Sequence, residues 1–162
     1  MTTRRDMLFT ATHSAIALSS LSLTGGALAA EKFKVTFTDA QWRAKLTPQQ
    51  YTVLRREATE RPGSSPLNSE HRAGTYSCAG CVLPMFSSKT KFDSGTGWPS
   101  FWKPIDNAVA TRKDRRFGMV EIEVHCSRCG GHMGHVFDDG PRPTGLRYCI
   151  NGISLTFAAQ TA

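Results

Sequence analysis

The sequence predicts a mainly β fold with one or two helices near its amino-terminal end. From Gly74 onward, short runs suited to strands alternate with clusters of Gly, Pro and Asp, as is typical of antiparallel strands joined by turns. A segment with helical periodicity and a clear start signal precedes them. Two Cys-x-x-Cys pairs have the spacing of zinc knuckles. A chain of 162 residues is long enough for one domain with its own core.

Residues 1–29 are predicted to be a cleaved export signal, and residues 30–162 the folded domain. Thr3-Arg4-Arg5-Asp6-Met7-Leu8-Phe9 has a twin-arginine pattern, and Ala27-Leu28-Ala29 is a small-residue cleavage site. Residues 8–23 are weakly apolar and diluted with Ser and Thr. A membrane anchor is the alternative, but a span needs about 20 apolar residues. We therefore expect export by the twin-arginine route, a periplasmic location and no lasting membrane span.

The formal net charge is +7, and positive residues cluster at Arg112-Lys113 and Arg115-Arg116. Such a cluster is able to meet nucleic acid. More often it is a solvated loop, and an exported protein meets little nucleic acid. We therefore expect no nucleic-acid partner, and we expect the protein to be a monomer.

A helix is predicted to begin at Thr47 and to end near Glu60. Thr47 is a suitable N-cap, Pro48 suits the first helical position, and Gln50 completes a capping box. Apolar residues then recur at helical spacing and form one stripe toward the core: Tyr51, Leu54 and Ala58. The Pro- and Gly-rich residues 61–66 form a loop.

Six later segments are predicted to be strands: 75–78, 84–87, 119–126, 132–137, 146–151 and 153–157. The first two flank a Cys-x-x-Cys pair and are expected to form a hairpin. In the third, three apolar residues alternate with three polar ones, namely Val120, Ile122 and Val124 with Glu121, Glu123 and His125. This alternation predicts a strand with one face toward solvent.

Four of the five cysteines form the two pairs, Cys78 with Cys81 and Cys126 with Cys129. One tight turn offers two thiolates, so two turns supply a tetrahedral Zn²⁺ site with no open position. We therefore predict a structural zinc that cross-links two hairpins distant in sequence. Two short disulfides are the alternative, and iron bound by the same ligands is a minor one.

Cys149 is the fifth cysteine and has no obvious partner. In an extended strand Arg147, Cys149 and Asn151 share one face, while Tyr148 and Ile150 point to the core. Arg147 would favour the thiolate electrostatically, and Asn151 could hydrogen-bond beside it. The alternative is a buried, inert cysteine.

His132 and His135 are candidate general acids or bases. Strict alternation places positions three apart on opposite faces of a strand. Both can face one site only if the strand bulges or bends, and Gly134 is a plausible place. Otherwise one of them has only a structural role. We expect the other two histidines considered, His71 and His125, to be surface or core residues.

Residues 97–102, Gly-Trp-Pro-Ser-Phe-Trp, form a stiff aromatic loop. Two tryptophans beside a proline usually belong to core or lid packing. An aromatic face also suits a thioether or S-methyl group through sulfur–aromatic contact.

Together these residues resemble the B-type methionine sulfoxide reductases over almost all of residues 30–162. The resemblance is carried by Trp42, residues 46–48, the 95–101 loop, both cysteine pairs, and the segments 131–137 and 145–151. It implies two small antiparallel sheets with a bound zinc. It also implies reduction of the R epimer of methionine sulfoxide in peptides or proteins.

Carried over by position, the resemblance makes Cys149 the nucleophile, which attacks the sulfoxide sulfur and becomes a sulfenic acid. His135 and His132 would protonate the departing oxygen. The remaining roles are Asn151 holding the site, Arg147 stabilising negative charge, and Trp98 and Phe137 binding substrate, with Trp98 against the S-methyl group.

One position departs from the family. Many members have a resolving cysteine where this chain has Thr96. With four cysteines on zinc, no fifth partner remains for Cys149. We therefore expect an external thiol to reduce the sulfenic acid, either a thioredoxin-like protein or a small thiol.

Two other classes fit part of the sequence. A zinc-knuckle binding module would use the basic loop and the aromatic residues, but it gives Cys149 no role. A cysteine hydrolase would pair Cys149 with His135, but no third, orienting residue stands out.

Overall fold

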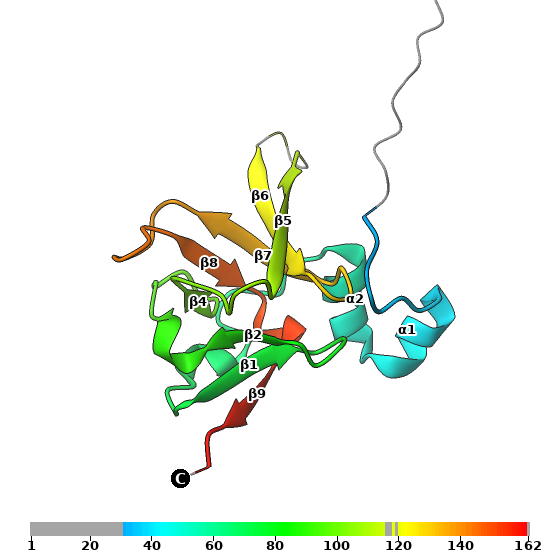
Figure 1. Ribbon diagram of the computed structural model, residues 1–162, viewed down its shortest axis with the longest axis horizontal. Coiled ribbons are helices and arrows are strands. Elements are labelled where there is room, and N and C mark those ends of the chain that lie inside the picture. Colours follow the sequence, from blue (N-terminus) through cyan, green and yellow to red (C-terminus); the bar gives the residue numbers. More distant parts are fainter. Residues whose placement is uncertain (1–30, 116–117, 119, 162) are drawn as a thin grey trace, which may run out of the picture. The chain divides into compact units, whose positions relative to one another are not determined.

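The computed structural model describes residues 31–115, 118 and 120–161. The predicted export signal lies outside the described residues, and so does Arg116 of the basic cluster. The elements described below belong to one unit, Lys32–Ala162 (Figure 1). In the part of this unit that is described, two α-helices precede two antiparallel sheets, which confirms the mainly β prediction.

Both helices begin with a capping box. Helix α1 (Asp39–Lys45) is capped by Thr38, and helix α2 (Pro48–Arg56) is capped by Thr47. The backbone N–H of Gln50 donates to the Thr47 hydroxyl at 3.2 Å, and the Thr47 N–H donates to the Gln50 side chain at 3.1 Å, as predicted. The buried stripe of α2 includes two of the predicted residues, Tyr51 and Leu54.

Helix α2 ends earlier than the sequence predicts, at Arg56 and not near Glu60. Glu57 adopts a left-handed conformation with a φ of 56°, which stops the helical hydrogen bonding. Ala58 therefore lies beyond the helix. The segment after the helix leads to the end of strand β8 (Arg147–Ile150), where the Glu60 N–H donates to the side chain of Asn151.

The smaller sheet has three strands in the order β2 (Pro84–Ser87), β1 (Gly74–Cys78) and β9 (Leu155–Ala159). Antiparallel pairing of β1 with β2 confirms the predicted hairpin around the first cysteine pair. Short 3₁₀ helices flank the strands, among them η1 (Pro66–Ser69), η2 (Ser88–Thr90) and η4 (Gly152–Ser154).

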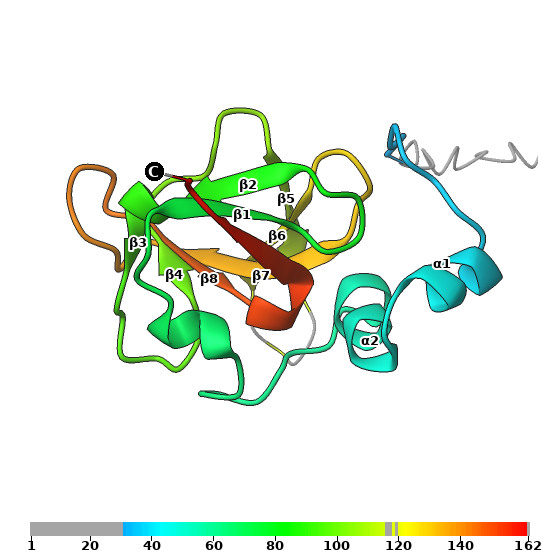
Figure 2. The same cartoon turned by 90° about the horizontal axis from the view of Figure 1, so that it is seen from below.

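The larger sheet has six strands in the order β3 (Lys91–Phe92), β4 (Ser100–Phe101), β8 (Arg147–Ile150), β7 (His132–Phe137), β6 (Glu121–Cys126) and β5 (Val109–Asp114). The chain passes from β8 through η4 into β9, so it leaves one sheet and enters the other (Figure 2).

An aromatic cluster joins the two sheets. Phe86 stacks on Phe101 with ring centroids 4.3 Å apart, and Tyr76 meets Phe101 edge-on at 5.0 Å. All three side chains are fully buried. Complete burial of a side chain of this size stabilises the folded state by about 1.5–3 kcal/mol, so this cluster is a main source of cohesion between the layers.

The prediction that the polar residues of the 119–126 strand face solvent is wrong. Glu123 and His125 are each only 1% exposed, whereas Val120 is 65% exposed. The buried carboxylate of Glu123 is tolerated because it accepts a hydrogen bond from His132 and forms an ion pair with Arg112. These partners come from neighbouring strands, and alternation within one strand does not reveal them.

Among the described residues, no helix is both long enough and apolar enough to cross a membrane.

Candidate active site

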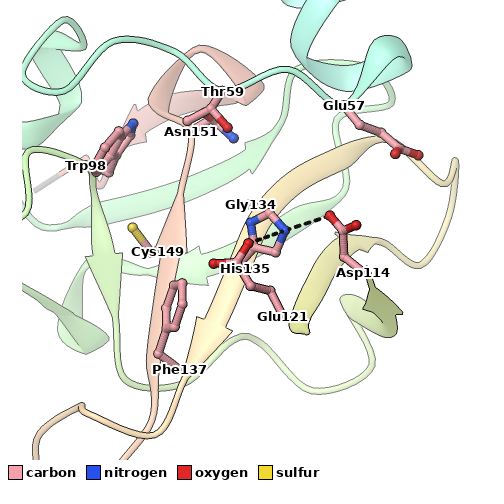
Figure 3. Close-up of a pocket in the computed structure, with 10 residues that line it drawn as sticks. All are labelled: Glu57, Thr59, Trp98, Asp114, Glu121, Gly134, His135, Phe137, Cys149 and Asn151. Atoms are coloured by element: carbon pink, nitrogen blue, oxygen red, sulfur yellow. Dashed lines mark hydrogen bonds and ion pairs between the residues drawn. The ribbon is translucent and has the colours of Figure 1, made fainter. Parts of the chain in front are cut away.

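A cavity of about 240 Å³ opens beside Cys149 (Figure 3). Strands β7 and β8 place His135 directly opposite Cys149, so both side chains leave the sheet on the same side. Five of the seven residues predicted for catalysis and substrate binding line this cavity: Cys149, His135, Asn151, Trp98 and Phe137. His132 and Arg147 lie outside its lining.

A bulge in β7 brings the two histidines together, as predicted from their spacing. The pairing with β6 shifts at this point, so that Met133 is the extra residue between His132 and Gly134. The His132 and His135 rings are therefore 5.5 Å apart, edge to face. Gly134 has a φ of 151°, and a Cβ there would overlap the backbone carbonyl of Cys149.

His132 is buried behind His135, and its orientation is fixed. Its Nδ1 lies 2.7 Å from a carboxylate oxygen of Glu123. A carboxylate only accepts, so Nδ1 carries the proton. The opposite nitrogen, Nε2, is buried and has no hydrogen-bond partner among the described residues.

His135 contacts two acidic side chains that sequence reasoning missed. Its Nε2 lies 3.2 Å from Asp114 and 3.7 Å from Glu121. These residues end β5 and begin β6, and β6 in turn lies beside β7. The predicted 119–126 strand contained Glu121, but its position beside His135 depends on strand pairing that the sequence does not specify.

Burial and local charge act in opposite directions on Cys149. Burial raises the pKa of the thiol, while a hydrogen bond from Thr96 and the positive charge of Arg147 lower it, and burial prevails. The Thr96 hydroxyl lies 4.0 Å from the sulfur. Arg147 therefore lowers the pKa of Cys149, as predicted, but its effect is smaller than that of burial.

Arg147 does not line the cavity, and its guanidinium is fixed by two neighbours. Its Nε and one terminal nitrogen donate to the two carboxylate oxygens of Asp139, each at 2.8 Å. Its guanidinium also lies over the Phe137 ring, 4.5 Å from the centroid. This bidentate and stacked geometry holds the cation near the sulfur.

Asn151 and Trp98 are tied to the segment that follows α2. The Asn151 amide donates to the Met133 carbonyl at 3.1 Å, and its oxygen accepts from the Glu60 N–H at 2.9 Å. The Trp98 indole N–H donates to the Glu60 carbonyl at 3.1 Å. Glu60 was not predicted as a site residue, because it contacts Asn151 and Trp98 through its backbone, which leaves no signature in the sequence.

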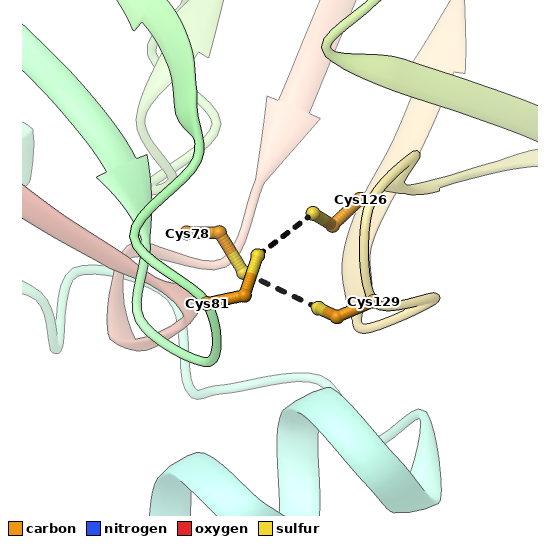
Figure 4. A group of neighbouring side chains, drawn as sticks. All are labelled: Cys78, Cys81, Cys126 and Cys129. Atoms are coloured by element: carbon orange, nitrogen blue, oxygen red, sulfur yellow. Dashed lines mark hydrogen bonds between the residues drawn. The ribbon is translucent and has the colours of Figure 1, made fainter. Parts of the chain in front are cut away.

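The four paired cysteines gather at a second place (Figure 4). Their sulfur atoms all lie within 4.8 Å of one another, an arrangement that could hold a metal ion. Two distances from one pair to the other are 3.7 Å, between the sulfur atoms of Cys78 and Cys129, and 3.5 Å, between those of Cys81 and Cys126. None of the four forms a disulfide, so the alternative of a disulfide within each pair is wrong. The prediction that the two pairs meet in a metal site is confirmed.

Fold and site together describe a small, mainly β domain with one cysteine beside a cavity and a separate group of four cysteines that could hold a metal ion. The model of the SelR domain matches residues 46–159, and the chain belongs to this family.

Its relatives include enzymes named peptide methionine sulfoxide reductase MsrB. The one from Pseudomonas putida is 56% identical over 125 residues, covering 76% of this chain and 94% of that protein. The one from Thiobacillus denitrificans is 57% identical over 121 residues, covering 74% and 92%. A solved structure of the Mis18 'Yippee-like' domain, at 17% identity and a TM-score of 0.46 over 56% of this chain and all of that one, is too dissimilar to inform function.

Proposed function

We propose that the protein reduces the R epimer of methionine sulfoxide in peptides and proteins. Membership of the SelR family supports this activity. The observation that carries the proposal is the position of Cys149, whose sulfur borders a cavity walled by Trp98 and Phe137 with His135 alongside. A nucleophile, a proton donor and an apolar wall for a thioether therefore meet in one place.

The reaction transfers two electrons from sulfur to sulfur. The Cys149 thiolate attacks the sulfoxide sulfur and forms an S–S bond, and the sulfoxide oxygen takes up one proton. Transfer of this hydroxyl group to the Cys149 sulfur breaks the S–S bond and the sulfoxide S–O bond. The products are methionine and the Cys149 sulfenic acid. His135 lines the cavity and supplies the proton, and His132 lies behind it as the second histidine of the pair.

Binding and charge stabilisation fall to the remaining residues. The Trp98 and Phe137 rings accept the S-methyl group, because aromatic faces attract polarisable sulfur and its methyl substituents. Asn151, only 3% exposed, holds the end of β8 to β7. Arg147 stabilises negative charge that develops near Cys149.

An external thiol then restores the enzyme. Two thiol equivalents convert the sulfenic acid into a thiol, releasing one water and leaving one disulfide in the reductant. Thr96 stands beside the sulfur where a resolving cysteine would be needed, and the other four cysteines belong to the metal site. The reductant is a thioredoxin-like protein or a small thiol.

The metal in the tetracysteine site is zinc, with a structural role. Four sulfurs at about 2.3 Å from a central Zn²⁺ are about 3.8 Å from one another, close to the 3.5 and 3.7 Å separations across the cluster. Bound there, the ion links the turns that hold Cys78 and Cys81 to those that hold Cys126 and Cys129.

The protein works in the periplasm after export by the twin-arginine route. The twin-arginine pattern, the weakly apolar stretch and the Ala27-Leu28-Ala29 site support this proposal. This route carries proteins already folded, so the metal is bound before export and four cysteines are protected in an oxidising compartment.

The deciding experiment offers the enzyme a peptide with separated R and S sulfoxide epimers, together with dithiothreitol, and follows the peptide mass. We expect loss of one oxygen, about 16 mass units, from the R epimer only. Cys149→Ser should abolish the reaction. A single turnover without reductant should leave a sulfenic acid that dimedone labels. Peptide cleavage, or full activity of Cys149→Ser, would refute the proposal.

A further inference from the structure

The segment between α2 and η1 forms one wall of the cavity without belonging to either sheet. Residues 57–65, here called the strap, contain no helix or strand. Glu57 and Thr59 of the strap line the cavity beside Cys149. Sheet hydrogen bonds do not hold this wall, so side-chain and backbone contacts of the strap itself must do so.

The Glu60 side chain anchors the strap to η4. Its two carboxylate oxygens accept hydrogen bonds from the backbone N–H groups of Gly152 and Ile153, at 2.5 Å and 3.0 Å. These are the two residues directly after Asn151. Hydrogen bonds to an ionised acceptor are stronger than those between neutral groups, so these two bonds anchor the strap at its centre.

The Glu60 backbone contacts both sides of the cavity. Its carbonyl accepts the indole N–H of Trp98, and its N–H donates to the side-chain oxygen of Asn151. Trp98 lies in the loop between β3 and β4, and Asn151 lies at the end of β8. One residue therefore uses its side chain as an anchor and its backbone to fix two residues of the site.

Two glycines allow the strap to approach closely. A Cβ at Gly152 would overlap the side chain of Ser65, and a Cβ at Gly97 would lie 2.9 Å from that of Pro62. The Gly63 N–H also donates to the Gly97 carbonyl at 2.7 Å. The strap therefore passes one glycine in η4 and one in the loop between β3 and β4, where a side chain would collide with it.

We infer that Glu60 is a positioning residue, which holds Trp98 and Asn151 in the arrangement that receives the oxidised methionine side chain. This inference rests on the proposed function. Glu60 does not line the cavity, so it acts through these two residues and exchanges no proton with substrate.

The first test compares Glu60→Ala and Glu60→Gln in steady-state kinetics on a peptide with R-methionine sulfoxide. We expect Glu60→Ala to raise KM by about tenfold and to lower kcat less, because the binding wall is displaced while Cys149 and His135 remain. Glu60→Gln keeps one oxygen for the η4 N–H groups and should fall between Glu60→Ala and the natural protein.

A spectroscopic readout separates positioning from general damage. In a two-dimensional ¹H–¹⁵N spectrum, the Trp98 indole signal, assigned with Trp98→Phe, should shift and lose protection from solvent exchange in Glu60→Ala. The indole signals of Trp42 and Trp102 should stay in place. As a control, Asp106→Ala removes an acidic side chain that is 79% exposed and should change neither KM nor the Trp98 signal.

A second pair of variants tests the same contact without touching Glu60. Gly152→Ala should displace the strap through its overlap with Ser65, and Ser65→Gly added to Gly152→Ala should restore most of the lost affinity. If Glu60→Ala does not fold, these two variants still test whether the contact between the strap and η4 positions the site. An unchanged KM and an unchanged Trp98 signal in Glu60→Ala, or no rescue by Ser65→Gly, overturns the inference. Failure of the natural protein to reduce any sulfoxide would instead overturn the proposed function.

Discussion

At Cys149 the environment favours a protonated thiol in the resting enzyme. Burial raises its pKa above that of a free cysteine, and the opposing effects of Thr96 and Arg147 are smaller. A thiol is a poor nucleophile, so Cys149 reacts slowly with oxidants and alkylating agents when no substrate is bound. The sequence led us to expect the cation beside the cysteine. It did not reveal the extent of burial, which depends on loops from elsewhere in the chain.

The pH dependence of Cys149 alkylation follows from this balance. The rate of reaction with iodoacetamide should rise with pH, with its midpoint above the ordinary value of about 8.5. Arg147→Ala removes a charge that stabilises the thiolate, so the midpoint should move to still higher pH. Arg43→Ala, on the exposed surface of α1, should leave it unchanged. A midpoint that Arg147→Ala lowers would contradict this account.

At the scale of elements, β6 and β7 show where sequence patterns succeed and where they fail. The bounds of β7 and the need for a bulge near Gly134 were predictable, because they follow from local turns and from the spacing of two histidines. The buried face of β6 was not. Glu123 is buried because Arg112 and His132 on adjacent strands meet it, and that pairing is a property of the sheet.

Glu123→Ala should destabilise the fold by about 3 kcal/mol, because it leaves the buried ring of His132 without its acceptor. Glu123→Gln should cost less, since the amide oxygen still accepts a hydrogen bond from Nδ1. Urea unfolding measures both. Glu121→Ala is the matched control on the same strand. Its side chain is 32% exposed, and its loss should cost less than about 1 kcal/mol. Equal costs for Glu121→Ala and Glu123→Ala would disprove the structural role of the Glu123–His132 pair.

At the scale of the whole molecule, the cysteine pairs connect the two sheets. Cys78 and Cys81 lie at the turn between β1 and β2, in the smaller sheet, while Cys126 and Cys129 lie at the turn between β6 and β7, in the larger one. Their spacing made a metal site predictable. That the ion would join one sheet to the other became clear only from the strand order.

Removal of the metal should therefore loosen the domain as a whole. Structural zinc contributes roughly 10–16 kcal/mol of binding free energy in small zinc peptides, so a loss of several kcal/mol is expected here. Treatment with a strong chelator, or Cys126→Ser, should lower the unfolding temperature and the bound zinc measured by mass spectrometry. Added Zn²⁺ should reverse the effect of the chelator. A metal-free protein with an unchanged unfolding temperature would show that the cluster has no structural role.

The direct passage of the chain from β8 through η4 into β9 has a consequence for synthesis. Cys149 and Leu155 are near neighbours in sequence, yet they belong to different layers. Asn151, between them, makes its side-chain contacts only when β7 and the segment after α2 have both come together beside β8. If the proposed function holds, we therefore expect a newly made polypeptide with incomplete tertiary structure to lack a working catalytic centre and to consume no reducing equivalents.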